Sequence, residues 1–188
     1  LETMRIAIPG EHTSAHLLFK ALVPPAKELV FCRYDEVTSK IKSGEVDAGV
    51  IIHETRFCFA DSGLVELCDL GALWEYRYQC PVPLGCLVAS RDLDVRTVEK
   101  LITALQSSLQ YAWDHPAASE VFVATHAQEL SSEVIRKHIE LYVSDETMQL
   151  SADAQKGIAT FLQLADPSLE QTSYASDWLF VTEAGLPS

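Results

Sequence analysis

The sequence lacks the features typical of a membrane protein or of a protein from an oxidising compartment. No apolar run reaches the roughly 18 residues of a membrane-spanning helix, and the start lacks the charged-then-apolar pattern of a signal sequence. The five cysteines include no Cys-x-x-Cys pair, and their spacings fit neither a zinc ribbon nor a disulfide framework. We therefore expect a cytoplasmic protein whose cysteines are reduced and mostly buried.

Basic residues are also scarce. The chain has 14 lysines and arginines against 27 aspartates and glutamates, for a net charge of −13 at pH 7. Because no basic stripe offsets this deficit, the composition argues against a nucleic-acid partner. What is present is an ordinary globular balance, 48% hydrophobic and 22% charged over 188 residues, without repeats or low-complexity tracts. This length suffices for one large domain or two small lobes.

The first part of the chain alternates between strand and helix patterns. We expect strands at residues 5–8, 29–34 and 50–52, and helices from residues 12–14 to about 23 and over residues 36–43. This β-α-β-α-β order predicts an α/β lobe with parallel strands and right-handed crossovers. Further short strands are expected within residues 63–71 and at residues 86–89, with a short helix or loop at residues 74–78.

Beyond Ser90 the pattern becomes helical. We expect helices over residues 95–113, 117–127, 131–143 and 151–164, and a short apolar segment at residues 178–181. The chain thus divides into an α/β lobe, residues 4–88, and a mainly helical part, residues 89–188. The connector at residues 81–85, with Pro81, Pro83 and Gly85, is equally consistent with a hinge between lobes and with a plain turn.

One histidine stands where small-molecule sites form in α/β proteins. The apolar residues 50–52 deliver His53 and Glu54 at the carboxyl end of a predicted strand, which is where open parallel sheets bind ligands. Since the ordinary pKa of histidine suits proton transfer near neutrality, we expect His53 to be a catalytic base. Glu54 should point to the opposite face and anchor a loop, with an ion pair to Arg56 as its structural role.

A second candidate site lies at the start of the first predicted helix. The Pro9-Gly10 turn leads to His12, Thr13 and Ser14, where free backbone N–H groups and two hydroxyls form a ready anion site. Thr13 can cap the helix, contact a ligand, or do both. His12 and His16 have the spacing of a metal pair, but no third ligand is evident nearby, so we expect no metal. His115, His126 and His138 are interpreted as surface or capping residues.

Several segments together resemble one enzyme family. They are residues 6–10 with Thr13 and Ser14, 44–54 with Arg56 and Phe57, 69–71 with Trp74 and Glu75, 83–85, 126–130, and 142–143. The chain resembles the dihydroxynaphthoate synthases of the futalosine route to menaquinone, within a superfamily shared with chorismate dehydratase. The segment Val50-Ile51-Ile52-His53-Glu54 separates the two groups.

The resemblance implies a fold like the type II periplasmic solute-binding proteins, with a parallel-rich sheet lobe followed by a helical segment of an incomplete second lobe. It implies a cofactor-free lyase that splits cyclic dehypoxanthinyl futalosine into dihydroxynaphthoate and a sugar-derived fragment. The family's base matches His53, and its substrate-contacting hydroxyls match Thr13 and Ser14. Further substrate contacts are expected from Gly10, His12, Pro83, Leu84 and Gly85.

The chain departs from the family at its start. Family members carry an upstream Ser-Pro-x-Pro-Asn-Asp-like stretch, and this sequence begins after it. We expect a shortened chain, a separate chain that supplies the rest, or a homodimer that covers exposed apolar surface. The leading hypothesis for function is the lyase. The alternatives are a protein of the same architecture that binds a small carboxylate or metabolite, and an inactive partner subunit.

Overall fold

The computed structural model describes residues 1–127 and 131–168, apart from the side chain of Glu54. The chain forms two compact units, Leu1–Val82 and Pro83–Ser188, which are called the first and second unit below. The division lies six residues before the boundary expected after residue 88. Residues 83–85 therefore belong to the second unit, whereas Gly10, His12, Thr13, Ser14 and His53 belong to the first.

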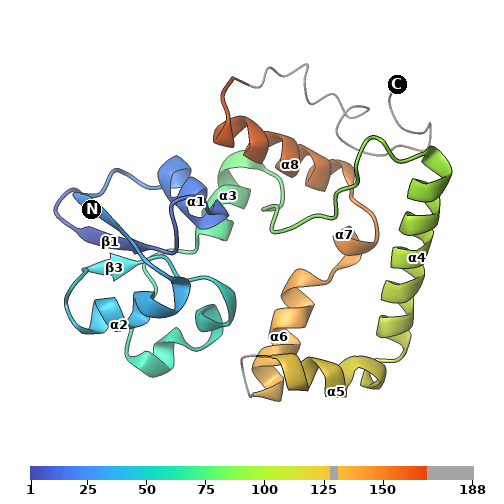
Figure 1. The fold of residues 1–188 in the computed structure, drawn as a ribbon. Helices are drawn as coiled ribbons and strands as arrows, with labels where there is room; N and C mark the ends of the chain where they lie inside the picture. The colour runs from blue at the N-terminus through green and yellow to red at the C-terminus, as the bar shows by residue number, and fades with distance from the viewer. Residues whose placement is uncertain (128–130, 169–188) are drawn as a thin grey trace. The chain divides into compact units, whose positions relative to one another are not determined.

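A parallel sheet of three strands forms the centre of the first unit (Figure 1). Its strands are β1 (Arg5–Ile8), β2 (Glu28–Phe31) and β3 (Ala48–Gly49), in the order β2-β1-β3. In the register, Ile6 lies opposite Leu29 on one side and Ala48 on the other. Helix α1 (Ser14–Leu22) connects β1 to β2, and a 3-10 turn (Tyr34–Glu36) with helix α2 (Val37–Lys42) connects β2 to β3. The predicted β-α-β-α-β order is confirmed.

The two faces of this sheet carry separate apolar clusters, because side chains alternate along a strand. One contains Ile6, Ile8 and Phe19, and the other contains Ala7, Val37 and Val46. Leu29 and Leu70 join the first cluster, while Val30, Cys32 and Ile51 join the second. Helix α1 therefore covers one face and α2 the other, which makes both faces of β1 part of the core.

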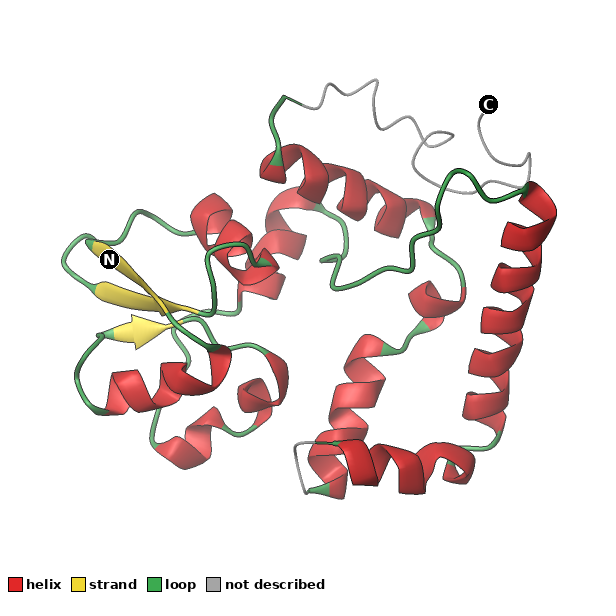
Figure 2. Ribbon diagram, viewed as in Figure 1, coloured by secondary structure: helices red, strands yellow, loops and turns green. Residues whose placement is uncertain are grey.

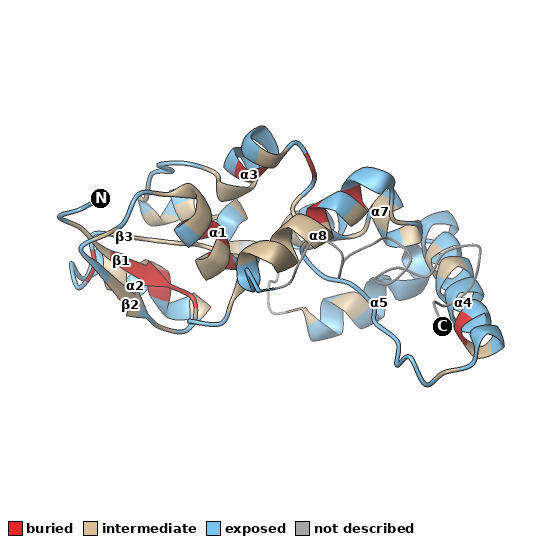
Figure 3. Ribbon diagram, turned by 90° about the horizontal axis from the view of Figure 1, so that it is seen from above, coloured by how far each residue is buried: buried red, intermediate tan, exposed pale blue. Residues whose placement is uncertain are grey.

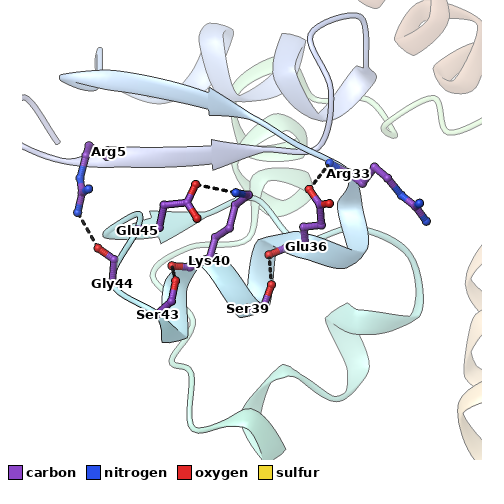
Figure 4. A network of polar contacts seen from close by, with 8 residues as sticks. All are labelled: Arg5, Arg33, Glu36, Ser39, Lys40, Ser43, Gly44 and Glu45. Carbon is purple, nitrogen blue, oxygen red and sulfur yellow. Dashed lines mark hydrogen bonds and ion pairs between the residues drawn. The ribbon is translucent and has the colours of Figure 1, made fainter.

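Polar contacts fix the segment that leads from α2 into β3 (Figure 4). The guanidinium of Arg5 donates to the carbonyl of Gly44 at 2.9 Å, and its backbone N–H donates to the Asp47 carboxylate at 2.7 Å. That backbone hydrogen bond, with the guanidinium beside it, lowers the pKa of Asp47 below its ordinary value. Lys40 pairs with Glu45 at 2.6 Å, and this hydrogen bond raises the lysine pKa. β3 is thus tied to β1 at its start.

Four of the predicted strands are wrong in extent or existence. The strand expected at residues 29–34 ends at Phe31, and Tyr34 instead opens the 3-10 turn before α2. β3 ends at Gly49, so residues 50–52 are not a strand, although the N–H of Val50 still donates to the Ala7 carbonyl at 2.9 Å. Its partner β1 ends at Ile8, and Pro9 has no N–H with which to continue the ladder. Residues within 63–69 and 86–89 are loop (Figure 2). Apolar side chains there, such as Val65 and Val88, are more than four-fifths exposed, and among the described residues no neighbouring strand pairs with them.

The rest of the first unit ends in a helix that packs against α1. Two 3-10 turns (His53–Phe57 and Phe59–Ser62) precede helix α3 (Leu70–Tyr78), which replaces the shorter element expected at residues 74–78. Asp69 caps α3 by accepting from the N–H groups of Gly71 and Ala72 at 2.7 and 3.2 Å. Trp74 is fully buried, and its indole N–H donates to the carbonyl of Pro81 at 3.3 Å. This tryptophan anchors α3 to the unit.

The second unit is helical, as predicted. It contains α4 (Val95–Asp114), α5 (Ala117–His126), α6 (Ser132–Tyr142), α7 (Asp145–Met148) and α8 (Ala152–Ala165), of which α7 was not expected. Asp94 and Ser151 cap α4 and α8. Among the described residues, the only hydrophobic side chains buried here are Val98 and Ala154, and most helical surface is exposed (Figure 3). The apolar segment expected at residues 178–181 lies outside the described residues, as do three of residues 126–130.

The cysteines are less buried than expected. All are free thiols, but only Cys80 is buried, Cys32 and Cys58 are half-buried, and Cys68 and Cys86 are exposed. Cys68 and Cys86 lie in the two loops that the sequence suggested to be strands, which explains their exposure. None of the described helices is both long enough and apolar enough to span a membrane.

Candidate active site

The carboxyl ends of the three parallel strands lie along one edge of the sheet, called the carboxyl edge below. The chain leaves it through residues 9–13 after β1, residues 32–33 after β2 and residues 50–52 after β3. The Ile8 carbonyl accepts from the N–H groups of both Gly10 and Cys32, at 2.8 and 3.1 Å. Because the strand order reverses at β1, the carboxyl edge is where an open α/β sheet binds ligands.

The loop after β1 presents the N-terminus of α1. Gly10 has a φ of +102°, a conformation that side chains disfavour, and it allows the tight turn after Pro9. The Thr13 hydroxyl donates to the Gly10 carbonyl at 2.9 Å and accepts from the His16 N–H at 3.2 Å, so the predicted cap is confirmed. Ser14 and His12 are exposed, and Thr13 is half-buried. One hydroxyl therefore organises the turn, while the other faces solvent.

His16 has a role that the sequence did not reveal. Its Nδ1 donates to the Glu11 carbonyl at 2.6 Å, and its ring stands edge-on to Phe31, with the ring centres 5.0 Å apart. These contacts join the loop after β1 to the end of β2. Among the described residues, no group of three or more His, Cys, Asp or Glu side chains is placed to hold a metal ion.

We expected His53 at the end of a strand, but the structure places it at the start of a 3-10 turn. Its φ is +57°, which is uncommon for a residue with a side chain, and its imidazole is exposed. The ring stands against Tyr34, with the ring centres 4.9 Å apart and the planes at 67°. The structure thus brings together residues from the loops after β2 and β3. Sequence reasoning missed Tyr34, although its position just after a strand could have indicated it.

Two other residues near the carboxyl edge have contacts that bear on the site. Arg56 pairs with Asp69 at 3.1 Å. The predicted ion pair of Arg56 with Glu54 stays a prediction, because the side chain of Glu54 lies outside the described part of the structure. Cys32 also lies at the carboxyl edge, but burial and the neighbouring Glu36 raise the pKa of its thiol. A nucleophilic cysteine needs a lowered pKa, so Cys32 is unsuited to that role.

The expected contacts from Pro83, Leu84 and Gly85 belong to the second unit. Pro83 is half-buried, and Leu84 and Gly85 are exposed in a loop. Two hollows in the described surface are lined by other residues. The first is lined by Leu22, Leu73, Tyr76, Arg77 and Gln79, and the second by Arg96, Glu99, Lys100, Thr103 and Ala104. Neither includes a residue of the carboxyl edge, so chemistry rather than cavity shape identifies the candidate site.

The carboxyl edge holds the parts that proton transfer on an anionic substrate requires. His53 is a base accessible to solvent, and the N-terminus of α1 offers backbone N–H groups with a partial positive charge. The hydroxyls of Thr13 and Ser14 add hydrogen-bonding groups to that helix end. The two halves lie on loops that follow the adjacent strands β1 and β3.

Comparisons with known proteins agree with one another. Residues 1–167 match the protein family described as "Menaquinone biosynthesis". The chain is 39% identical over 166 residues to a 1,4-dihydroxy-6-naphthoate synthase of Thermus thermophilus, covering 88% of this chain and 61% of that protein. It is 38% identical over 165 residues to the synthase of Streptomyces coelicolor, covering 85% and 58%.

A solved structure is similar over the same part of the chain. The crystal structure of protein AF1704 from Archaeoglobus fulgidus matches with a TM-score of 0.79 and 30% identity, covering 89% of this chain and 63% of that one. The chain therefore spans less than two thirds of the length of each of these relatives.

Proposed function

Because this chain belongs to the menaquinone biosynthesis family, we propose that it is a cofactor-independent carbon–carbon lyase that forms 1,4-dihydroxy-6-naphthoate from cyclic dehypoxanthinyl futalosine. Two relatives named as 1,4-dihydroxy-6-naphthoate synthases support the product. The observation that supports this chemistry is the exposed imidazole of His53 at the carboxyl edge of the parallel sheet. The backbone of His53 itself is in the left-handed region.

In the proposed reaction His53 is the general base. It takes a proton from a sugar hydroxyl or an acidic carbon of the substrate, and the electron pair released there forms a double bond as the adjacent carbon–carbon bond breaks. The electron pair of the broken bond passes to the other carbon as an enolate, and the imidazolium returns the proton to it. The sugar-derived fragment leaves and the remaining ring system becomes aromatic. The N–H groups at the start of α1, with Thr13 and Ser14, hold the polar end of the substrate. Gly10, His12, Pro83, Leu84 and Gly85 are proposed as further contacts.

The proposed architecture is the two-lobed, type II periplasmic-binding-protein-like fold acting in the cytoplasm. The α/β unit with its parallel sheet supports one lobe. In the second unit, Val121 and Phe122 of α5 are 79% and 68% exposed, which is costly for apolar side chains in water. We propose that a second copy of the chain or another polypeptide covers such surface. A solution mass equal to a well-behaved monomer of 20.8 kDa would count against this part of the proposal.

The test of the lyase is the His53→Gln variant, compared with the wild type and with His115→Gln. The control removes a histidine of the second unit that stacks on Tyr111, with ring centres 4.3 Å apart. For a general base we expect kcat to fall about 10²–10⁴-fold in His53→Gln, with substrate affinity within about threefold of the wild type. His115→Gln should retain both values.

Other outcomes separate the alternatives. A protein that only binds the metabolite would bind the substrate and show no turnover even as the wild type. Turnover that survives in His53→Gln would remove His53 from the role of base while leaving the reaction in place.

A further inference from the structure

The described structure places the ring of Tyr34 against the ring of His53. The two residues come from loops that follow β2 and β3, which lie on opposite sides of β1 in the sheet. Their contact therefore bridges the carboxyl end of the central strand. The ring centres are 4.9 Å apart at an angle of 67°, the edge-to-face arrangement that aromatic rings prefer.

The backbone on the Tyr34 side is firmly anchored. The N–H of Arg33 donates to the Glu36 carboxylate at 3.3 Å, and the N–H of Glu36 donates to the Arg33 carbonyl at 3.1 Å (Figure 4). The turn then leads directly into α2, whose first residue, Val37, is fully buried. Tyr34 is half-buried at the start of this turn, so its backbone is held by the same contacts.

The backbone on the His53 side is less constrained. The last ladder hydrogen bond of this segment joins Val50 to Ala7, three residues before His53. Ile51 packs against the apolar cluster of Ala7, Val37 and Val46, and this is the last core contact before His53. The φ of +57° at His53 is sparsely populated, and such conformations persist only where the surroundings hold them. An exposed imidazole on this backbone needs a partner to keep one orientation.

We infer that Tyr34 is a positioning residue, whose ring holds the His53 imidazole in the orientation required for proton abstraction. The inference rests on the proposed function, since it gives Tyr34 a role in that reaction. Tyr34 acts through His53 and transfers no proton itself. The phenol ring, rather than its hydroxyl, supplies the contact, so phenylalanine should replace tyrosine without loss.

The experiment combines a structural readout with kinetics. In the wild type, nuclear Overhauser contacts should join the ring protons of Tyr34 and His53. In Tyr34→Leu these contacts vanish, and we expect kcat to fall about tenfold with KM within about twofold, because substrate is still bound but the base is less often aligned. Tyr34→Phe should restore the ring contacts and kcat. Tyr111→Leu, which removes a similar tyrosine–histidine contact in the second unit, should match the wild type.

Three results would overturn the inference and leave the lyase intact. The first is that the wild-type protein shows no ring contacts between Tyr34 and His53. The second is that Tyr34→Leu keeps the wild-type kcat. The third is that Tyr34→Phe is as impaired as Tyr34→Leu, because that result would assign the effect to the hydroxyl. The wild-type measurement decides the contact even if Tyr34→Leu does not fold. Absence of turnover in the wild type is a different result, which overturns the proposed function and the inference with it.

Discussion

Replacing Gly49 with alanine should destabilise the first unit and disturb the segment that carries His53. A Cβ atom at Gly49 would lie 2.5 Å from Val37 Cγ1, 3.2 Å from the Ala7 Cβ and 3.3 Å from Ile41 Cδ1. Carbon atoms in ordinary contact are about 3.5–4.0 Å apart, so the new methyl overlaps Val37 heavily. Val37 is fully buried and β-branched, and it has little freedom to move away.

The expected cost follows from overpacking a tight core. Extra methyl groups forced into such cores typically cost about 1–3 kcal/mol. For a cooperative unit of this size, Leu1–Val82, each kcal/mol lowers the melting temperature by about 4–8 °C. We therefore expect Gly49→Ala to lower it by between about 4 and 24 °C, measured by circular dichroism and checked by urea denaturation. Gly85→Ala is the matched control, since no heavy atom lies within 4 Å of its new Cβ.

A double-mutant cycle tests the stated cause. Val37→Ala removes the overlapping methyl group and by itself should cost about 2 kcal/mol for the two methyls lost from the core. If the overlap with Val37 causes the instability, the double variant should be more stable than the sum of the single variants predicts, by at least about 1 kcal/mol. Additive effects within about 0.5 kcal/mol, or a Gly49→Ala variant as stable as the wild type, would refute the reasoning.

Three further predictions concern single side chains of the same unit. His53→Gly should be more stable than His53→Val by about 1–2 kcal/mol in urea denaturation, because glycine accepts the positive φ and a β-branched residue does not; equal stability would remove the claim of strain. Asp47→Asn should be less stable than the wild type at neutral pH. Since the pKa of Asp47 is lowered by its contacts with Arg5, this difference should shrink as the pH falls below about 4, and a difference independent of pH would contradict it. Asp69→Ala should cost about 1 kcal/mol through the lost cap of α3, whereas Arg56→Ala, which removes the exposed ion pair and the contact of the guanidinium with the Phe57 ring, should cost less than half as much; the reverse order in thermal melts would count against the cap.

Local sequence signals predicted the helices well. Thr13, Asp94 and Ser151 are capping residues in front of amphipathic patterns, and each caps its helix in the structure. A capping residue and the apolar pattern that follows it act within a few residues, so both can be recognised in the sequence. Strands were predicted less well, since residues 51–52 and 86–89 have apolar strand-like patterns but pair with no strand among the described residues. A strand needs a neighbouring strand for its hydrogen bonds, and the sequence of one strand does not reveal how far its neighbour extends.

The candidate site shows the same contrast. The sequence indicated the α1 N-terminus and His53, because each follows a predicted strand of a parallel sheet. It did not indicate the contact of His53 with Tyr34, nor that of His16 with Phe31. Each pair joins residues at the carboxyl ends of two different strands or in the segments that follow them.

The sequence by itself determined the α/β order, most of the helix ends and the family, because hydrophobic period, caps and motifs are local properties of the chain. Only the tertiary structure decided where the ladder stops, which loops meet at the carboxyl edge and how His53 is turned. β1 ends at Ile8, before Pro9, and Gly49 lies so close to Val37 that no Cβ fits there. These features depend on atoms brought together from separate segments, and that proximity exists only after folding.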